Sequence, residues 1–270
     1  MNPGTATCSA ALRILLAAVL SLVAMYSFAA GGFCETGSTA TRVPVLELYT
    51  SEGCSGCPPA DRWLSTLPAR GFTPDHVIPL AFHVDYWDQL GWPDGMAKAQ
   101  FSARQRMQAQ RNHASIVYTP QLLLNGTDYP RSFADSHFGD RVREFNRLPA
   151  AAELSLRQRP VTSGVEVQLD MRQLQVAGGG VQTYIAITEN RLQSAIRAGE
   201  NQGKLLHHDF VVRDLVGPLP ADKSGQVHWK SIMILRPDWK RADLSLVAFV
   251  QDARNADILQ ALHSPFCIPP

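Results

Sequence analysis

Residues 45–60 read VLELYTSEGCSGCPPA, and this stretch decides which fold the chain is expected to adopt. Val45 to Thr50 is a short run rich in apolar and β-favouring side chains, as expected of a buried strand. The run leads directly into a loop that holds Cys54 and Cys57, and Pro58-Pro59 follows. Proline suits the first turn of a helix, where the N–H that it lacks would have no partner. The stretch therefore predicts a strand, a cysteine loop and a helix that begins just after Cys57.

Two cysteines spaced in this way at the start of a helix are typical of thiol–disulfide exchange. The thiolate is the reactive species, and the positive potential at a helix N-terminus lowers the pKa of a thiol. Cys54 is the candidate nucleophile, and Cys57, inside the first turn, is the candidate resolving thiol. Zinc sites use the same spacing, but the sequence has no second CxxC and no HxxxH to complete four ligands.

The sequence around the cysteines alternates strand and helix signals as far as residue 150. Apolar runs predict strands, and stretches without Gly or Pro, or with apolar residues at helical spacing, predict helices. The expected strands are residues 77–84 and 121–124, the latter closed by the turn Asn125-Gly126, and the expected helices are residues 96–112 and 133–148. This alternation predicts an α/β layer structure.

Residues 151–267 have a different pattern. Apolar and polar residues alternate in short runs that are separated by turn residues, which suggests a β-sandwich. We therefore expect an α/β domain at residues 30–150, followed by a mainly β, sandwich-like C-terminal domain at residues 151–270.

The strand, CxxC loop and helix, with Thr119-Pro120 before a later strand, resemble the thioredoxin superfamily. This resemblance implies a thioredoxin-like fold in which Pro120 is a cis-proline facing the cysteines and the backbone of Thr119 pairs with a bound peptide. The alternative is an ordinary trans proline at a strand edge. The sequence departs from thioredoxin itself because Gly53 replaces Trp and Ser55-Gly56 replaces Gly-Pro. Glu47 is the nearest candidate for the buried acidic group of that fold, although its register is one residue off.

Four longer strings resemble a secreted bacterial family catalogued as domain of unknown function 1223. They are LELYTSEGCSGCPPAD (residues 46–61), HVDYWDQLGWPD (83–94), VYTPQLLLNG (117–126) and GENQGKLLHHDFVVRDL (199–215). That family is described as thioredoxin-like and has no settled activity. The resemblance therefore implies a fold, and leaves the function to the cysteines.

A dense group of polar and aromatic residues follows the strand at residues 77–84. Tyr86 and Trp87 are candidates to line a substrate groove, with Thr119 and Pro120. Asp85 and His83 are candidates to modulate the thiolate, and His83 also to bind a metal ion. The alternative is a packed loop in which Asp85 caps backbone groups and the aromatic rings bury area.

His207-His208 is the other sequence feature that suggests a metal ion. Adjacent residues on a strand point to opposite faces, so the two rings cannot chelate together. We therefore assign no metal site there, and no chemistry to the loop-like stretch Gly199-Glu200-Asn201.

The first 29 residues predict a signal peptide. Arg13 precedes an apolar run from Ile14 to Met25, and Ser27-Phe28-Ala29 fits a cleavage site. The run is shorter than the roughly 20 residues that span a bilayer, although an uncleaved anchor remains the alternative. A periplasmic or secreted protein is expected.

The chain has five cysteines, and Cys8 would leave with the signal peptide. An even number in an exported protein favours disulfides. Cys54 and Cys57 pair by proximity, and Cys34 and Cys267 are candidates for a structural disulfide because chain ends often lie close together. The alternative for the second pair is two free thiols.

The formal net charge of +1, without a run of Lys or Arg, excludes the basic surface of a nucleic-acid binder. We expect a thiol–disulfide oxidoreductase that acts on protein or small-molecule substrates with an unidentified redox partner. It needs no cofactor or metal beyond the Cys54–Cys57 disulfide, and no membrane beyond a possible uncleaved signal anchor. The alternatives are a copper-handling protein that uses Cys54, Cys57 and His83, and a binding module whose CxxC is a structural disulfide.

Overall fold

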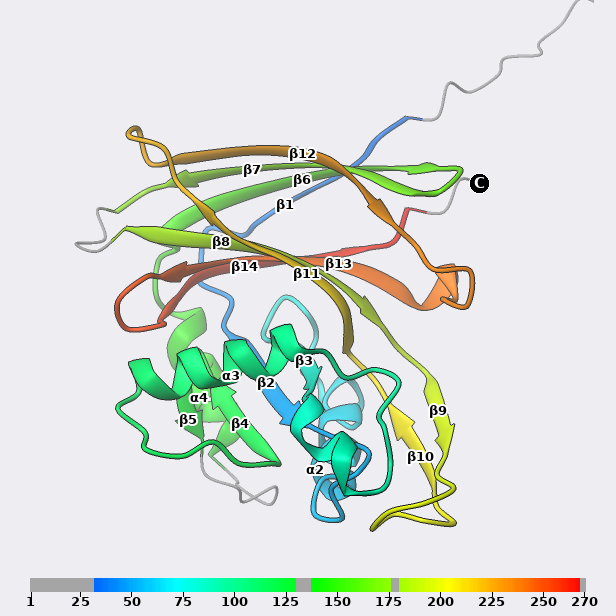
Figure 1. Ribbon diagram of the computed structural model, residues 1–270. Coiled ribbons are helices and arrows are strands. Elements are labelled where there is room, and N and C mark those ends of the chain that lie inside the picture. The colour runs from blue at the N-terminus through cyan, green and yellow to red at the C-terminus, as the bar shows by residue number, and fades with distance from the viewer. Residues whose placement is uncertain (1–31, 130–136, 176–179, 268–270) are drawn as a thin grey trace, which may run out of the picture. The chain divides into compact units, whose positions relative to one another are not determined.

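The protein is mostly β (Figure 1). In the computed structural model, which describes residues 32–129, 137–175 and 180–267, 44% of the described residues lie in strands and 19% in helices. The predicted signal peptide at residues 1–29 and the predicted helix start at residues 133–136 lie outside the described residues. Within the described part, no helix is both long and apolar enough to cross a membrane.

The central element is an eight-stranded sheet with the order β14-β13-β8-β11-β3-β2-β4-β5. Four of its strands come from the first half of the chain and four from the second half. The first four are β2 (Val45–Thr50), β3 (Ile78–His83), β4 (Gln121–Leu124) and β5 (Thr127–Tyr129). The second four are β8 (Val181–Glu189), β11 (Val211–Pro220), β13 (Leu244–Asp252) and β14 (Ile258–Pro265).

The two sets of strands join where β11 runs parallel to β3. Val211 lies opposite Ala81, and the backbone N–H of Ala81 donates to the carbonyl oxygen of Phe210 at 2.8 Å. This pairing covers the edge of β3, which would otherwise present unpaired backbone groups. Residues of both halves therefore share one sheet.

The expected fold class is wrong. A thioredoxin-like α/β fold followed by a separate sandwich-like β domain does not describe this chain, because the described residues from Phe33 onward form one compact unit with few helices. The sequence pattern located strands in both halves, but alternation shows which side chains face a core and not which strand edges pair. The β11–β3 pairing is the contact that the pattern could not show.

A second sheet packs against the part of the large sheet that comes from the second half. Its antiparallel order is β1 (Cys34–Gly37), β6 (Ala152–Val161), β7 (Gly164–Gln173) and β12 (Gln226–Ile234). Leu156 and Val167 of the small sheet share one buried cluster with Ile187 and Leu246 of the large sheet. This burial is the reason for the alternating pattern of residues 151–267.

Helices cover both faces of the β2–β4 region. On one face, α2 (Pro58–Ser65) and α4 (Phe138–Asn146) pack with the η1 turn (Pro68–Arg70) near them, and Leu64 and Phe138 lie in one cluster with Leu48. On the other face, α3 (Ala99–Arg111) packs through Phe101 on Phe82. The 3-10 turn η2 (Asp85–Leu90) follows β3, and the 3-10 turn η3 (Arg241–Asp243) precedes β13.

Helix α3 spans the junction between the two halves. The guanidinium of Arg104 lies 5.6 Å from the ring centroid of Phe82 on β3, 4.8 Å from that of Tyr184 on β8 and 5.0 Å from that of Phe249 on β13. A cation over aromatic faces is held by the ring quadrupoles. The same helix therefore packs on strands from both halves.

A small two-stranded sheet, β9 (Leu192–Ala195) and β10 (Leu205–His208), lies just before β11 in the chain. Figure 1 shows it beside α2 at the end of the large sheet. The residues between its two strands and the end of β10 supply part of the site described below.

The predicted Cys34–Cys267 disulfide is confirmed. The two Cα atoms are 6.0 Å apart, and the bond links residues separated by 233 positions. It ties the start of β1 to the chain just after β14, and so joins the edge of the small sheet to the large one.

Replacing Cys34 and Cys267 together by serine is expected to lower the free energy of unfolding by roughly 2 to 5 kcal/mol, because the bond restricts the unfolded chain. Urea unfolding followed by far-ultraviolet circular dichroism measures this, and the denaturant slope should rise as the unfolded chain expands. The matched control replaces Cys54 and Cys57, which are separated by only three positions and should contribute much less. An unchanged unfolding free energy in the Cys34/Cys267 variant would contradict a structural role.

Candidate functional site

The cysteine loop lies where the sequence predicted it, between β2 and α2. Cys54 and Cys57 form a disulfide with their Cα atoms 5.4 Å apart. Cys57 is the N-cap residue of α2, and its backbone N–H donates to the carbonyl oxygen of Cys54 at 3.2 Å. The disulfide thus closes the turn from which the helix starts.

Both cysteines are buried, whereas the two residues between them are exposed. Cys54 is 2% exposed and Cys57 is 0% exposed, but Ser55 and Gly56 face solvent. A turn is therefore presented to solvent while its sulfur atoms are covered.

The segment between β9 and β10 is hydrogen-bonded to this loop, and its residues Glu200 and Asn201 are called the cover below. The side-chain amide of Asn201 donates to the carbonyl oxygens of Glu52 and Cys54 at 2.8 and 2.9 Å. The backbone N–H of Ser55 donates to the carboxylate of Glu200 at 2.9 Å. The sequence analysis assigned no chemistry to this segment, because hydrogen bonds to a loop almost 150 residues earlier leave no local pattern.

The Thr119–Pro120 peptide bond is cis, as the resemblance to the thioredoxin superfamily implied. Pro120 lies against the cysteine turn, because a β-carbon at Gly56 would be 3.8 Å from Pro120 Cδ and 4.0 Å from Cys54 Sγ. The indole N–H of Trp87 donates to Thr119 Oγ1 at 2.7 Å. These residues, all partly exposed, form a surface beside the turn.

Tyr86 and Asp85, two candidate site residues on η2, face α3. The Tyr86 hydroxyl donates to Gln105 Oε1 at 3.1 Å, and the Asp85 backbone N–H and carboxylate both bond to the Ser102 hydroxyl. Asp85 therefore fastens the start of η2 to α3 and has no contact with the cysteines among its hydrogen bonds.

Glu47 lies on the opposite face of the sheet from α2. Its carboxylate accepts two hydrogen bonds from Arg104 of α3, at 2.7 and 2.9 Å, and one from Tyr49 at 2.6 Å. Because side chains alternate along β2, Thr50 faces α2 and Glu47 does not. The structure thus places Glu47 in a buried ion pair away from the cysteine turn.

His83 is fully buried at the end of β3, and its Nδ1 lies 2.6 Å from the carboxylate of Asp94. The same carboxylate accepts the backbone N–H groups of Glu52 and Met96, both at 2.9 Å. Burial raises the pKa of Asp94, but His83 and the two N–H groups outweigh it and bring the pKa to about 2. An ionised Asp94 accepts a hydrogen bond from Nδ1–H of His83, so Nε2 is the ring nitrogen that faces the neighbouring side chains.

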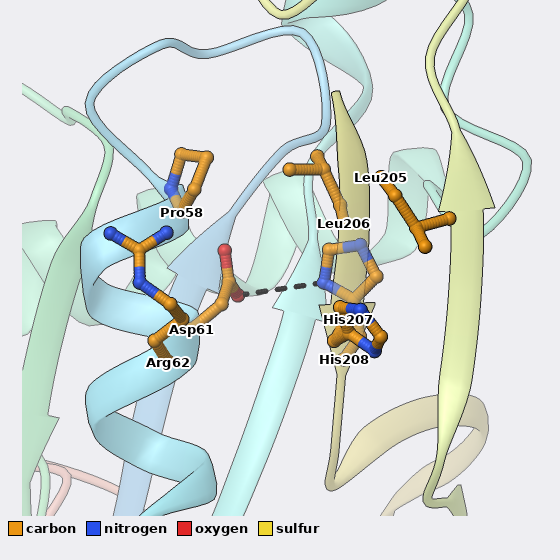
Figure 2. A pocket seen from close by; sticks show the side chains of 7 residues that line it. All are labelled: Pro58, Asp61, Arg62, Leu205, Leu206, His207 and His208. Carbon is orange, nitrogen blue, oxygen red and sulfur yellow. Dashed lines mark ion pairs between the residues drawn. The ribbon is translucent and has the colours of Figure 1, made fainter. Parts of the chain in front are cut away.

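His208 of β10 lies beside His83, with the two ring centroids 5.0 Å apart. Its Nε2 is 3.3 Å from Glu52 Oε1, and its Nδ1 is 3.9 Å from Asp61 Oδ1. Burial lowers the pKa of His208, but the two carboxylates outweigh it and raise the pKa to about 10. Figure 2 shows Asp61 on α2 facing His208 across a narrow gap.

The histidine–carboxylate cluster consists of Glu52, Asp61, His83 and His208. Of its members, the sequence indicated His83 as a candidate site residue, and His208 only as one of an adjacent pair to which no metal site was assigned. The two histidines of β10 do point to opposite faces, as expected, since His207 is exposed and His208 is buried. The sequence pattern did not show that His208 contacts acidic residues of the cysteine loop and α2 without help from His207. These residues lie about 150 positions earlier in the chain.

A family model described as "Protein of unknown function (DUF1223)" matches residues 45–251. Among solved structures, protein AGR_C_4864 from Agrobacterium tumefaciens is 23% identical, with a TM-score of 0.59 over 86% of this chain and 98% of that one. HBP35 of Porphyromonas gingivalis is 15% identical, with a TM-score of 0.64 over 85% of this chain and 76% of that one. At these identities the two structures support the fold alone. No match was found among curated proteins.

Replacing Asn201 by alanine is expected to expose Cys54. The change leaves two buried carbonyl groups without a donor, at roughly 1 to 3 kcal/mol each, so the covered state of the loop becomes less favourable. In the reduced protein, the rate of Cys54 alkylation by iodoacetamide should rise by about tenfold or more, measured by peptide mass spectrometry. Gln202→Ala, at the exposed neighbouring position, is the matched control. Equal rates in the two variants would show that this segment does not control access.

Proposed function

This chain belongs to the DUF1223 family, and we propose that it carries out thiol–disulfide exchange through Cys54 and Cys57. The observation that carries the proposal is the disulfide at the N-terminus of α2, in a turn whose exposed tip lies against the cis-proline Pro120. Two disulfides among the described residues fit an oxidising compartment, so we place the activity in the periplasm or outside the cell.

The short span of the Cys54–Cys57 bond supports a chemical role. In the chain-entropy account, stabilisation by a disulfide grows with the logarithm of the loop that it closes. A separation of three positions therefore contributes roughly 4 kcal/mol less than the separation of 233 between Cys34 and Cys267. A bond that constrains the unfolded chain so little is better explained by exchange with a substrate.

The proposed exchange is balanced in atoms and electrons. The Cys54 thiolate attacks one sulfur of a substrate disulfide, forms a mixed disulfide and releases the other substrate sulfur as a thiolate, which takes a proton from water. The Cys57 thiol loses its proton and attacks Cys54 Sγ, which releases the second substrate thiol. The substrate gains two electrons, the Cys54–Cys57 disulfide forms, and a dithiol partner returns it to the reduced state; the reverse sequence oxidises a substrate dithiol.

The start of α2 favours a thiolate by its field and not by direct hydrogen bonds. Pro58 and Pro59 have no N–H group, and the N–H groups of Ala60 and Asp61 both donate to the carbonyl oxygen of Cys57. The positive potential of the helix end remains. The negative charge of Asp61 in the first turn opposes this potential, and the positive charge of His208 beside it offsets that opposition.

The surface beside the turn suits a peptide substrate. We propose that the backbone at Thr119, the ring of Pro120 and the indole of Trp87 form its floor, with Tyr86 at the margin. All four residues are partly exposed, and Trp87 and Thr119 are hydrogen-bonded to each other. A substrate disulfide reaches Cys54 only when the cover formed by Glu200 and Asn201 moves aside.

A binding module with a structural disulfide is the second candidate, and the burial of both cysteines favours it. Copper handling by Cys54, Cys57 and His83 has less support. Among the described residues, the ligand atoms that lie close enough together for a metal ion are those of Asp61, His83 and His208, and neither cysteine is included.

Redox titration of the full chain against glutathione mixtures is the first test. Mass spectrometry of alkylated peptides should show one two-electron transition for Cys54 and Cys57, at a potential of about −270 to −120 mV. The Cys54→Ser variant should lose exchange with a model disulfide, because the attacking sulfur is gone. The Cys57→Ala variant should accumulate a mixed disulfide on Cys54, because the resolving sulfur is gone.

The Cys34→Ser/Cys267→Ser variant is the control and should keep both the transition and the exchange. A Cys54–Cys57 pair that stays oxidised at every accessible potential, with no trapped mixed disulfide, would overturn the proposal. That outcome would favour the binding module.

The substrate surface makes a separate prediction. Trp87→Phe keeps an aromatic ring but removes the 2.7 Å hydrogen bond to Thr119. That bond stabilises the floor of the proposed surface by about 1 kcal/mol. The KM for a peptide disulfide should rise roughly fivefold while the reduction potential stays unchanged. Thr119→Val should have the same effect, and the double variant should be no worse than either single one, because both remove one bond. Additive effects would show that the bond is not what positions the substrate.

A further inference from the structure

We propose that Asp61, His83 and His208 form a binding site for a divalent transition-metal ion, of which Zn²⁺ fits best, with Glu52 holding the other ring nitrogen of His208. The ligand atoms of the first three lie within 4.8 Å of one another. All four side chains are buried, since each is at most 6% exposed. The proposal is independent of the redox proposal and uses neither cysteine.

Several polar atoms of the cluster lack a hydrogen bond. His83 Nε2, both ring nitrogens of His208 and Glu52 Oε1 are buried and have no hydrogen bond of acceptable geometry. A buried polar atom without a partner costs roughly 1 to 3 kcal/mol. His83 Nε2 has no hydrogen-bond partner, whereas the ring nitrogens of His208 face Glu52 Oε1 and Asp61 Oδ1 as an ion pair, so an ion that binds here takes the place of a His208 proton.

Three side chains of the cluster are held by an outer hydrogen bond, and the second polar atom of each faces the other members. Nδ1 of His83 is bonded to Asp94, so Nε2 faces inward. The Thr50 hydroxyl donates to Asp61 Oδ2 at 3.0 Å, and the Trp92 indole donates to Glu52 Oε2 at 2.8 Å, so that Oδ1 and Oε1 face His208. A histidine whose other nitrogen is bonded to a carboxylate is a recurring outer-shell arrangement of zinc sites.

The donor set selects the kind of ion. Two imidazole nitrogens and a carboxylate oxygen suit Zn²⁺, whereas Ca²⁺ and Mg²⁺ prefer oxygen alone and Cu⁺ prefers sulfur. Zn²⁺ also balances the charge of the Asp61 and Glu52 carboxylates. Ligand atoms around a tetrahedral zinc ion lie about 3.4 Å apart, so the present spacing must close by roughly 1 Å, which side-chain rotation can supply.

A small opening leads to the cluster from solvent. Its volume is about 50 Å³, which is enough for an ion or a water molecule, and Asp61 and His208 lie on its wall. Figure 2 shows these two side chains facing each other between α2 and β10, with Pro58 and Arg62 beside them. Three protein ligands would leave one position of the ion for water, and they would fasten β10 to α2.

The test uses the purified full chain, freed of metal by a chelator and titrated with ZnCl2 by isothermal calorimetry. One ion should bind per chain with a Kd of about 1 μM or lower. His208→Gln and Asp61→Asn should each weaken binding by about 100-fold, and Asp94→Asn, which acts through His83, by about tenfold to 100-fold. Zn²⁺ should raise the Tm of the wild type and leave that of His208→Gln unchanged.

His207→Gln is the matched control, because the His207 ring is exposed and is not among the side chains whose ligand atoms lie close together. It should bind Zn²⁺ like the wild type. The Cys54→Ser/Cys57→Ser variant should also bind normally. Absence of binding in the wild type, equal binding in His208→Gln and Asp61→Asn, or loss of binding in the cysteine variant would each overturn the proposal.

A second measurement does not depend on any variant folding. Co²⁺ added to the metal-free wild type should give the visible absorption of a tetrahedral nitrogen and oxygen site. A strong near-ultraviolet charge-transfer band would instead show thiolate ligands, and the cluster would then not be the site.

Discussion

The short parallel contact between β11 and β3 is the constraint on which the site depends. It places Val211 opposite Ala81, two residues before His83, and so fixes where the chain that precedes β11 must lie. That chain is β9, β10 and the segment between them, which brings His208, Glu200 and Asn201 to the cysteine turn. Without this pairing, the β3 edge would be open and the cysteines would have no cover.

Local sequence signals predicted much of the first half. The strand at 45–50, the helix after Cys57, the strand near β3 and the turn after β4 were all expected where they occur, because each depends on nearby residues. The Cys34–Cys267 bond was also predictable, since few cysteines remained to pair. The fold class was not, because the pairing of β11 with β3 joins strands 130 positions apart and leaves no periodic signal. For the same reason no metal site was expected at His207-His208, because the carboxylates of Glu52 and Asp61 lie about 150 positions earlier in the chain.

Electrostatic repulsion between buried carboxylates destabilises the histidine–carboxylate cluster, and the surrounding hydrogen bonds hold these groups close together. Glu52, Asp61 and Asp94 bring three carboxylates into one buried region, and the positive charge of His208 offsets only one of them. Buried charges of one sign repel strongly at low dielectric, and a divalent ion that takes the place of a His208 proton brings one more positive charge to the cluster. The outer bonds from Thr50 and Trp92 hold the carboxylates in place and prevent them from turning away to relieve the repulsion.

One continuous segment of the chain carries both the cover of the cysteine loop and His208 of the histidine–carboxylate cluster. Asn201 bonds to the carbonyl oxygens of both Glu52 and Cys54, and the chain from Asn201 runs within a few residues into β10 and His208. Opening the cover therefore breaks bonds to the same loop that carries Glu52, while His208 holds the other end of the segment against α2. Whatever occupies the cluster strengthens that hold, because it adds bonds between β10 and α2 without adding any to the exposed tip at Ser55 and Gly56. The energy needed to reach Cys54 is thus set in part by groups that never touch a sulfur atom.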